Sequence, residues 1–448
     1  MNKKLMAVAV VGALTAPGLA VAQVGGTPGV SLYGRLDTGV MIQKFSADGA
    51  GLISELKKND LFSPGNALGF RGREDLGGGT AAWFQLETGV WPDGRLDSAA
   101  TSGQHFGGRN SAVGFSSAGG DVLFGIWDSP YKVAYGTANL VTSGGFASSG
   151  IIMGNGDTTG ALPNALCQTT LSNSSGSIAV AAPVLSSCAT EVTGNSTSWS
   201  RRNNNSIQYW SPVFSGVQFK LATALANYQS ADSSPTASGV QKPKYYSGNV
   251  TYARGPLAVA AGYESHEGFR PGNTAAGTPN PKDNAFQIGA KWDFGLGQVG
   301  AGYEQLKYND NGSAAGATGN NGGMKVPSWV VNGRLNAGPG AVWGSYNKSQ
   351  GGKSCSTANM VIGNAACGVQ AKMTVVGYDY VMSKRTKMFA AYAKIDNGWN
   401  GTVGSNYYYI AGPAAQGTGG VTGGRGTAGG LIAGTDVTTL SLGIQHTF

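Results

Sequence analysis

The feature that most constrains this chain is a repeat of alternating apolar and polar residues in segments of about ten, sixteen of which follow Val30. About ten residues is the length that a tilted β-strand needs to cross a bilayer. The breaks between segments are alternately short turns and long, polar, glycine-rich stretches, seven of the first kind and eight of the second. Loops sorted by length in this way are typical of a transmembrane barrel, and they put both termini on one side.

The sixteen predicted strands are listed by residue number as 31–45, 67–75, 80–90, 109–116, 121–127, 202–211, 217–227, 244–253, 257–264, 284–294, 298–308, 326–335, 341–348, 369–382, 385–395 and 436–448. Residues 46–66 are predicted to form the first long loop, and residues 128–200 the third.

The side-chain period supports a membrane location. In the last segment Leu440, Leu442 and Ile444 share one face, whereas Thr439 and Ser441 share the other. One face suits lipid and the other suits water. Because unpaired backbone groups cost several kcal/mol in a bilayer, such strands must close into a ring. The prediction is an all-β fold, an antiparallel transmembrane β-barrel of sixteen strands with short periplasmic turns and long external loops.

Composition agrees with this fold. The chain has 74 glycines and only 12% charged residues, and glycine weakens a helix by about 1 kcal/mol relative to alanine. Disorder is disfavoured because 41% of the residues are hydrophobic. The formal net charge is +8 without any basic run, so nucleic-acid binding has little support.

The first 22 residues are predicted to be a secretory signal peptide. Lys3 and Lys4 precede an apolar run at 5–16, and Ala20-Val21-Ala22 is a small-residue cleavage site. A transmembrane anchor is the alternative, but the run is too short to span a bilayer as a helix. Residues 23–448 are then one barrel domain.

The four cysteines of an exported chain are expected to be oxidised. The neighbouring pairs are Cys167 with Cys188 and Cys355 with Cys367, although three connectivities are formally possible. Zinc binding is the competing interpretation. It is disfavoured because neither pair has CxxC spacing and no histidine is close to either.

Catalytic chemistry has little basis in the sequence. The chain has three histidines, His105 and His266 in predicted loops and His446 on the predicted lipid face, so no nucleophile and base share a plausible site. The match to GxGxxG at 295–300 is followed by a strand rather than a helix. We therefore expect no enzyme activity, no cofactor and no metal.

Several motifs together resemble the general porins of β-proteobacterial type. Residues 68–79 with 84–87 resemble the second hairpin of that family, residues 31–37 its first strand, residues 205–209 with 211–212 its sixth, and the terminal Phe448 its assembly signal. The resemblance implies an outer-membrane homotrimer whose sixteen-stranded barrels pass small hydrophilic solutes, each narrowed by the third loop folding inward. The implied partners are other copies of the chain, outer-membrane lipid and lipopolysaccharide, and the barrel assembly machinery through Phe448.

Two departures from the family pattern affect the pore. The family usually carries Gly-Arg-Gln at the end of strand five, whereas this chain has Gly125-Ile126-Trp127, so one expected basic wall residue is missing. The third loop, which begins at Asp128 and includes Tyr131 as a constriction candidate, is also unusually long and contains Cys167 and Cys188.

Period-two counting predicts which charged side chains point into the lumen. The predicted constriction wall consists of Arg35, Arg71, Arg73 and Arg202, and the other predicted lumen-facing charges are Asp37, Asp75, Glu87, Lys220, Lys291 and Arg334. Rings of arginine or lysine favour anions, so we expect a weakly anion-favouring channel. Pairing of the arginines with the acidic groups would instead leave the lumen nearly neutral. An adhesin or structural barrel, or a substrate-specific channel, is the alternative function.

Overall fold

The computed structural model describes residues 29–46, 55–63, 65–90, 92, 106–141, 171–173, 176–178, 199, 202–225, 244–267, 282–308, 324–350, 370–397 and 436–448. Residues 1–28, which include the predicted signal peptide, lie outside this set. So do Cys167, Cys188, Cys355 and Cys367, and with them both predicted disulfides.

The described chain is almost entirely β-strand. The strands of the large sheet are β1 Gly29–Phe45, β2 Leu56–Phe62, β3 Ala67–Gly77, β4 Thr80–Thr88, β5 Ser111–Ser117, β6 Gly120–Asp128, β9 Arg202–Trp210, β10 Val217–Ala224, β11 Lys244–Arg254, β12 Leu257–Glu267, β13 Lys282–Asp293, β14 Gly297–Tyr308, β15 Met324–Ala337, β16 Gly340–Gln350, β17 Gln370–Val381, β18 Thr386–Asn397 and β19 Val437–Thr447. A short helix, α2 Pro130–Tyr135, follows β6, and β7 Leu171–Asn173 pairs with β8 Gly176–Ile178 in a separate hairpin.

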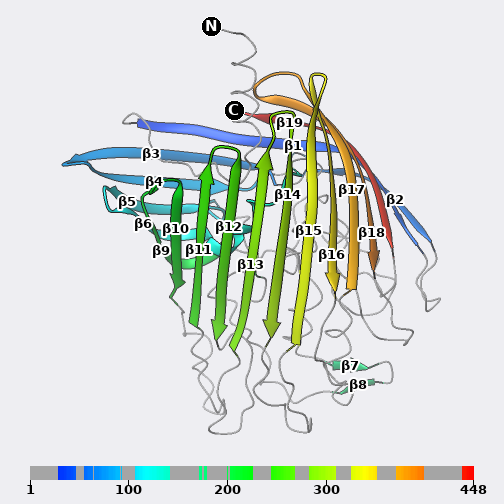
Figure 1. Ribbon diagram of the computed structural model, residues 1–448, viewed down its shortest axis with the longest axis horizontal. Helices are drawn as coiled ribbons and strands as arrows, with labels where there is room; N and C mark the ends of the chain where they lie inside the picture. The colour runs from blue at the N-terminus through cyan, green and yellow to red at the C-terminus, as the bar shows by residue number, and fades with distance from the viewer. Residues whose placement is uncertain are drawn as a thin grey trace.

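The large sheet closes on itself as an antiparallel barrel (Figure 1). Apart from β2 and β3, which both pair with β1, successive strands of the sheet pair with each other, and the last strand β19 pairs with β1 in a register that sets Val40 opposite Leu442. The terminal Phe448 exchanges both backbone hydrogen bonds with Gly34 of β1 at 3.1 Å. The pairing of β19 with β1 closes the ring, which is the condition for strands to stand in lipid.

One strand of the ring is interrupted. Half of the long strand β1 pairs with β2 and the other half with β3, so counting β2 and β3 together gives the sixteen strands that the sequence predicts. The amide Nδ2 of Asn66 donates to the carbonyls of Asp37 (3.0 Å) and Ser63 (3.3 Å), and its Oδ1 accepts from the backbone N–H of Asp37. Asn66 thus supplies ladder hydrogen bonds where the strand breaks.

The prediction that residues 46–66 form only a loop was therefore wrong. The strand β2 lies within that stretch, and its sequence Leu-Lys-Lys-Asn-Asp-Leu-Phe shows little alternation. Its exposed Lys57 and Asn59 lie where the strand has left the apolar belt. The alternation of apolar and polar residues, by which the other strands were predicted, therefore could not identify β2.

Seven short turns connect consecutive strands at the end of the barrel where Phe448 lies, which we call the turn end (Figure 1). The opposite end, reached by the long connections, is the loop end. Positive φ angles at Gly255 (60°) and Gly295 (86°) explain the glycines in two of these turns. The carboxylate of Asp293 accepts a hydrogen bond from the N–H of Gly295 at 2.8 Å and stabilises the turn.

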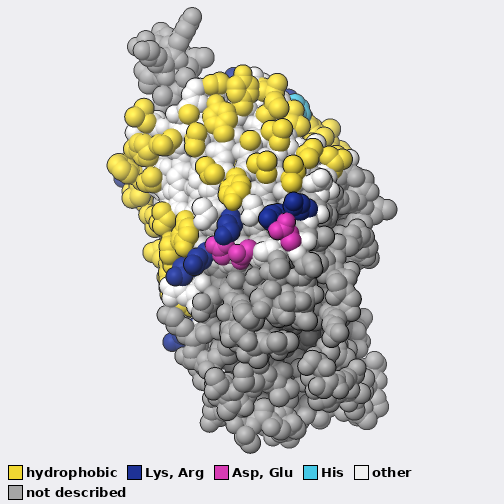
Figure 2. All heavy atoms as spheres, turned by 90° about the vertical axis from the view of Figure 1, so that its right-hand side faces the viewer, with side chains coloured by type: hydrophobic (Ala, Val, Ile, Leu, Met, Phe, Trp, Pro, Cys, Tyr) yellow, Lys and Arg dark blue, Asp and Glu magenta, His cyan; other side chains and the backbone are white. Residues whose placement is uncertain are grey.

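The barrel is apolar outside and polar inside. In β19, Leu440, Leu442 and Ile444 are 53%, 56% and 42% exposed, whereas Thr439 and Ser441 are 2% and 1% exposed. Figure 2 shows the apolar belt on one side of the barrel. A soluble protein would bury the leucines and expose the hydroxyls, so this inversion fits a barrel that is surrounded by lipid.

No helix in the described ranges is long and apolar enough to cross a membrane.

Candidate pore-lining site

The segment that follows β6 lies against the inner wall of the barrel. Ser129 caps α2, its Oγ accepting from the N–H of Lys132 at 3.0 Å. The Tyr131 hydroxyl donates to Glu304 Oε1 at 2.7 Å, and the Tyr131 N–H donates to Ser247 Oγ at 3.0 Å. Both partners belong to wall strands and are buried, so the predicted constriction candidate Tyr131 is anchored inside the barrel.

The same segment continues across the wall as far as Val141. The Asn249 amide donates to the carbonyl of Pro130, and the Asn332 amide donates to that of Ala138, both at 2.7 Å. A Cβ added to Gly289 would lie 2.7 Å from the Cβ of Ala138, so this glycine is needed for the close approach.

The residue Trp199 lies near this anchor. Its indole stacks on the ring of His266, with 3.9 Å between centroids, and lies 6.3 Å from the ring of Tyr131. His266 is a buried member of β12 rather than a loop residue, which corrects its predicted place; its Nε2 lies 2.8 Å from Glu264 Oε1. The strand continues beyond the predicted boundary because His266 and Glu267 still pair with β11.

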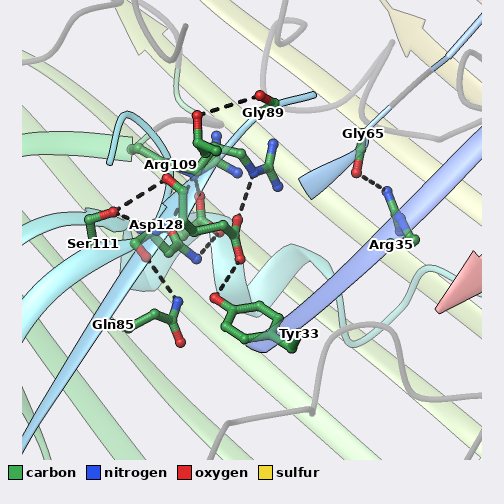
Figure 3. A network of polar contacts seen from close by, with 12 residues as sticks. Tyr33, Arg35, Gly65, Gln85, Gly89, Arg109, Ser111 and Asp128 are labelled. Atoms are coloured by element: carbon green, nitrogen blue, oxygen red, sulfur yellow. Dashed lines mark hydrogen bonds and ion pairs between the residues drawn. The ribbon is translucent and has the colours of Figure 1, made fainter. Parts of the chain in front are cut away.

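A second cluster of polar side chains lies on the wall formed by β1 and β3 to β6. The Arg109 Nε donates to Glu87 Oε1 at 2.6 Å, and the Tyr33 hydroxyl donates to Glu87 Oε2 at 3.0 Å. Figure 3 shows Tyr33 and Arg109 converging in this way, with Asp128 close by and Arg35 reaching separately to Gly65. Glu87, predicted to face the lumen, is thus held between an arginine and a tyrosine.

The carboxylate of Asp128, where the third loop begins, joins two further cations. Its Oδ1 lies 3.2 Å from Lys132 Nζ and 3.2 Å from Arg202 Nε. The Asn110 amide donates to Asp128 Oδ2 at 3.0 Å, while Asn110 Oδ1 accepts from Arg202 Nε at 3.0 Å. The predicted wall residue Arg202 is therefore ion-paired.

The backbone near Arg202 departs from the regular alternation on which its prediction was based. Asn205 has a φ of 50°, and Asn203 is buried together with Ser206 and Gln208. The irregularity shifts the alternation of inward-facing and outward-facing residues by one position between Asn203 and Ser206, as a β-bulge does. The side chain of Arg202 is placed by Asp128 and not by simple counting.

The other predicted wall arginines make contacts with neutral groups. Arg35 Nη2 donates to the carbonyl of Gly65 at 2.6 Å. The guanidinium carbon of Arg71 lies 5.2 Å from the centroid of the Tyr33 ring, and Arg73 Nη1 donates to Ser116 Oγ at 3.3 Å. Neither Arg35 nor Arg71 forms an ion pair with any carboxylate of the described chain.

The predicted lumen-facing acids have separate roles. Asp37 is buried, and its Oδ2 accepts from the Gln445 amide at 3.0 Å. Asp75 is exposed beside a turn, where its Oδ1 accepts from the N–H of Gly77 at 2.9 Å.

The three remaining predicted cations lie on three different strands. Arg334 Nη1 lies 3.0 Å from Asp379 Oδ2, and Lys387 shares that oxygen at 3.2 Å. Lys220 is buried, with its Nζ 4.2 Å from the centroid of the Trp210 ring. Lys291 is half-buried in β13 opposite Gly300.

Sequence reasoning missed two cations of this site, Arg109 and Lys132. Counting backwards from β5 puts Arg109 on the outward face with Val113 and Phe115, but Arg109 precedes the strand, where the chain bends. Lys132 lies in the helix α2, where a period of two has no meaning. Arg109 is held by Glu87 of β4, and Lys132 by Asp128, four residues earlier in the chain.

The third missed group is a cluster of three tryptophans inside the barrel. The ring centroids of Trp83 and Trp127 are 5.9 Å apart, and those of Trp127 and Trp210 are 5.4 Å apart. Leu123 and Ala112 complete this buried cluster. The wall is therefore aromatic next to Ile126, the position at which the family resemblance implies an arginine.

No group of three metal-ligating side chains lies together in the described ranges.

A closed antiparallel ring with an apolar exterior, a polar interior and a segment laid along its inner wall defines the class of protein as a transmembrane β-barrel channel. The chain belongs to the Gram-negative porin family, whose model matches residues 7–400. It is an outer-membrane porin and not an enzyme.

Two similar relatives support this assignment. The chain is 26% identical over 454 residues to the outer membrane porin protein 32 of Delftia acidovorans, covering 100% of both chains. It is also 26% identical over 405 residues to an outer membrane porin protein of Bordetella pertussis, with 82% of this chain and 89% of that one covered.

Among solved structures, the fold is similar to the anion-selective porin from Comamonas acidovorans, with a TM-score of 0.62, 22% identity and coverage of 94% of this chain and 99% of that chain. OmpT of Vibrio cholerae has the same architecture with a TM-score of 0.53 and 13% identity, covering 94% and 97% of the two chains. These likenesses show the fold.

Proposed function

We propose that this porin passes small hydrophilic solutes by diffusion and weakly favours anions. The observation that carries the proposal is the excess of cations in the cluster around Glu87 and Asp128. The cations there are Arg35, Arg71, Arg109, Lys132 and Arg202, and the carboxylates are Asp37, Glu87 and Asp128. We call these eight residues the arginine network.

The pairing pattern supports a weak rather than a strong preference. Glu87 and Asp128 are neutralised by Arg109, Lys132 and Arg202, whereas the guanidinium groups of Arg35 and Arg71 contact neutral groups. Rings of basic side chains favour anions in a pore. Charges farther apart than about 10 Å are screened at ordinary salt, so the preference should shrink as the salt concentration rises.

The third loop is proposed to narrow the pore. The support is the set of hydrogen bonds that hold residues 130–138 against wall strands. A narrowed pore brings permeating ions closer to the arginine network, and this strengthens the effect of each unpaired arginine.

The test is the reversal potential across a potassium chloride gradient in planar bilayers. We expect the wild-type protein to favour chloride, and Arg35→Gln and Arg71→Gln each to shift the potential toward potassium. Arg254→Gln is the matched control, because Arg254 is exposed at the turn end of β11. Potassium preference in the wild type would contradict the anion proposal. No conductance at all would favour the adhesin or structural barrel, and saturable transport of one solute would favour a substrate-specific channel.

The porin is further proposed to assemble as a homotrimer in contact with lipopolysaccharide. The support is membership of the porin family and a lipid-facing surface of exposed apolar residues. Phe448, tied to β1 by two hydrogen bonds, is the proposed recognition point for the assembly machinery. Light scattering in mild detergent should give the mass of three chains, and a monomer would contradict this.

The proposal also includes removal of a signal peptide on export and formation of disulfides in the loops. Residues 1–22 are proposed to be removed, so that N-terminal sequencing should begin at Gln23. Disulfides are proposed between Cys167 and Cys188 and between Cys355 and Cys367. Non-reducing peptide mapping should find these two pairs, and cross-pairing between the two loops would refute them.

A further inference from the structure

Lysines stand on the outer surface at the loop end of successive strands. Their outward direction follows from alternation: Lys325, for example, shares its face of β15 with Val331 and Leu335, each 53% exposed. We call the set the lysine ring, and its members are Lys244 on β11, Lys282 on β13, Lys307 on β14, Lys325 on β15, Lys348 on β16, Lys372 on β17, Lys394 on β18, Lys44 on β1 and Lys57 on β2.

The charged ring borders the apolar belt directly. Figure 2 shows a row of basic and acidic side chains immediately below the apolar belt, on the side of the barrel where β1, β2 and β17 to β19 lie. Three carboxylates are interspersed in the ring: Glu55 lies 2.9 Å from Lys44, Glu267 3.0 Å from Lys244, and Asp396 2.6 Å from Lys394.

Two lysine pairs of the ring face each other without a neutralising partner. Lys307 is directly opposite Lys325 across β14 and β15, and Lys348 is directly opposite Lys372 across β16 and β17. None of these four forms an ion pair with a carboxylate in the described ranges. Like charges directly opposite in a sheet are destabilising, so an external anion would relieve the repulsion.

An aromatic girdle fixes the depth of these lysines. Trp329, opposite Lys348, and Tyr346, two residues from Lys348, contact each other with 5.3 Å between ring centroids. Tyr303 lies opposite Trp329 on the same outward face. Aromatic girdles sit at the interface between the apolar core and the headgroups, so the lysines just beyond them are at the level of the headgroups.

The other end of the same strands has a different character. At the turn end the outward positions are Val299 on β14, Leu335 on β15, Val342 on β16 and Tyr380 on β17, all exposed. The outward-facing positive charge on these four strands is thus confined to the leaflet at the loop end, which is the outer leaflet in barrels with short periplasmic turns.

We propose that the pairs Lys307–Lys325 and Lys348–Lys372 bind the phosphate groups of a phosphorylated glycolipid in the outer leaflet. The ammonium group is a compact charge that suits phosphate, and its flexible stem lets it reach the headgroup while lying along apolar surface. The proposal rests on the outer-membrane location and deepens the proposed contact with lipopolysaccharide by naming the residues and the phosphate chemistry.

The test is titration of the detergent-solubilised porin with diphosphorylated lipid A, the bound molecules being counted by native mass spectrometry. The variant carries Lys307→Gln, Lys325→Gln, Lys348→Gln and Lys372→Gln together, and we expect its affinity to fall at least tenfold. The same four changes to arginine should retain binding. Added salt should weaken binding to the wild type.

A control at the turn end removes Arg254, Lys384 and Arg385 by substitution with glutamine and should leave binding unchanged. Equal binding of phosphate-free lipid A by the wild type would overturn the proposal, as would undiminished binding by the quadruple variant. Heat-modifiable migration in gels checks folding. If the quadruple variant does not fold, the two double variants are titrated separately, and each should lose at least threefold.

The same variants separate this proposal from the channel function. The four lysines face outward, so the quadruple variant should keep the wild-type conductance in bilayers. A wild-type protein that bound lipid A without conducting would refute the channel function and leave the lysine proposal standing.

Discussion

The Nε atom of Arg109 lies 2.6 Å from the Oε1 atom of Glu87 on the wall of the pore. The Tyr33 hydroxyl occupies the other oxygen of this carboxylate. Glu87 therefore cancels the charge of an arginine that sequence reasoning had not identified, while Arg35 and Arg71 remain outside any such pair in the described chain.

Opposite substitutions in this pair should have opposite effects on selectivity. Glu87→Gln leaves the charge of Arg109 uncompensated and should shift the reversal potential toward chloride, whereas Arg109→Gln should shift it toward potassium. Glu267→Gln is the control, because Glu267 pairs with Lys244 on the outward rim. Shifts of the same sign in both variants would show that the pair does not set the potential of the pore.

Removing the Tyr131 hydroxyl should loosen the segment that lies along the inner wall. In Tyr131→Phe the buried Glu304 loses a donor at 2.7 Å, at a cost of about 1–3 kcal/mol. We expect larger current fluctuations in single-channel recordings, with the barrel remaining heat-modifiable. Tyr303 lies on the exposed face of β14, the strand that carries Glu304, so Tyr303→Phe should behave as the wild type. Current fluctuations no larger than those of the wild type in Tyr131→Phe would argue against this anchor.

A side chain at Gly289 should displace the same segment by contact. The added Cβ would lie 2.7 Å from the Cβ of Ala138, well inside van der Waals distance, so Gly289→Val should change the single-channel conductance. At Gly333 the nearest atom to an added Cβ is 3.8 Å away, and Gly333→Val should conduct normally. Equal conductance for the two variants would mean that the segment yields without effect on the pore.

The interruption between β2 and β3 should depend on Asn66. Asn66→Ala removes the hydrogen bonds to Asp37 and Ser63, and leaving such buried groups unpaired costs about 1–3 kcal/mol each. In a gel assay of heat-modifiable migration, the temperature at which the folded barrel is converted to the unfolded chain should fall. Asn59→Ala, at an exposed position of β2, should leave that temperature unchanged, and a similar drop in both variants would contradict the role of Asn66.

Much of the barrel follows from local pattern. The alternation in β19 and the sorting of short and long connections predicted the strands, the closure and the lipid-facing side, because a strand in lipid must present apolar residues at every second position. The same counting fails at β2, which lies beyond the apolar belt and carries no such pattern.

The sequence by itself determined the type of fold, the membrane address and the face of regular strands on which Arg35 and Arg71 lie. Only the tertiary structure decided which charges are neutralised: Arg202 is placed by Asp128 across an irregular register, and Arg109 by Glu87 from another strand. The physical reason is that side-chain period is a local property of one strand, whereas an ion pair depends on how distant segments are brought within about 4 Å of each other.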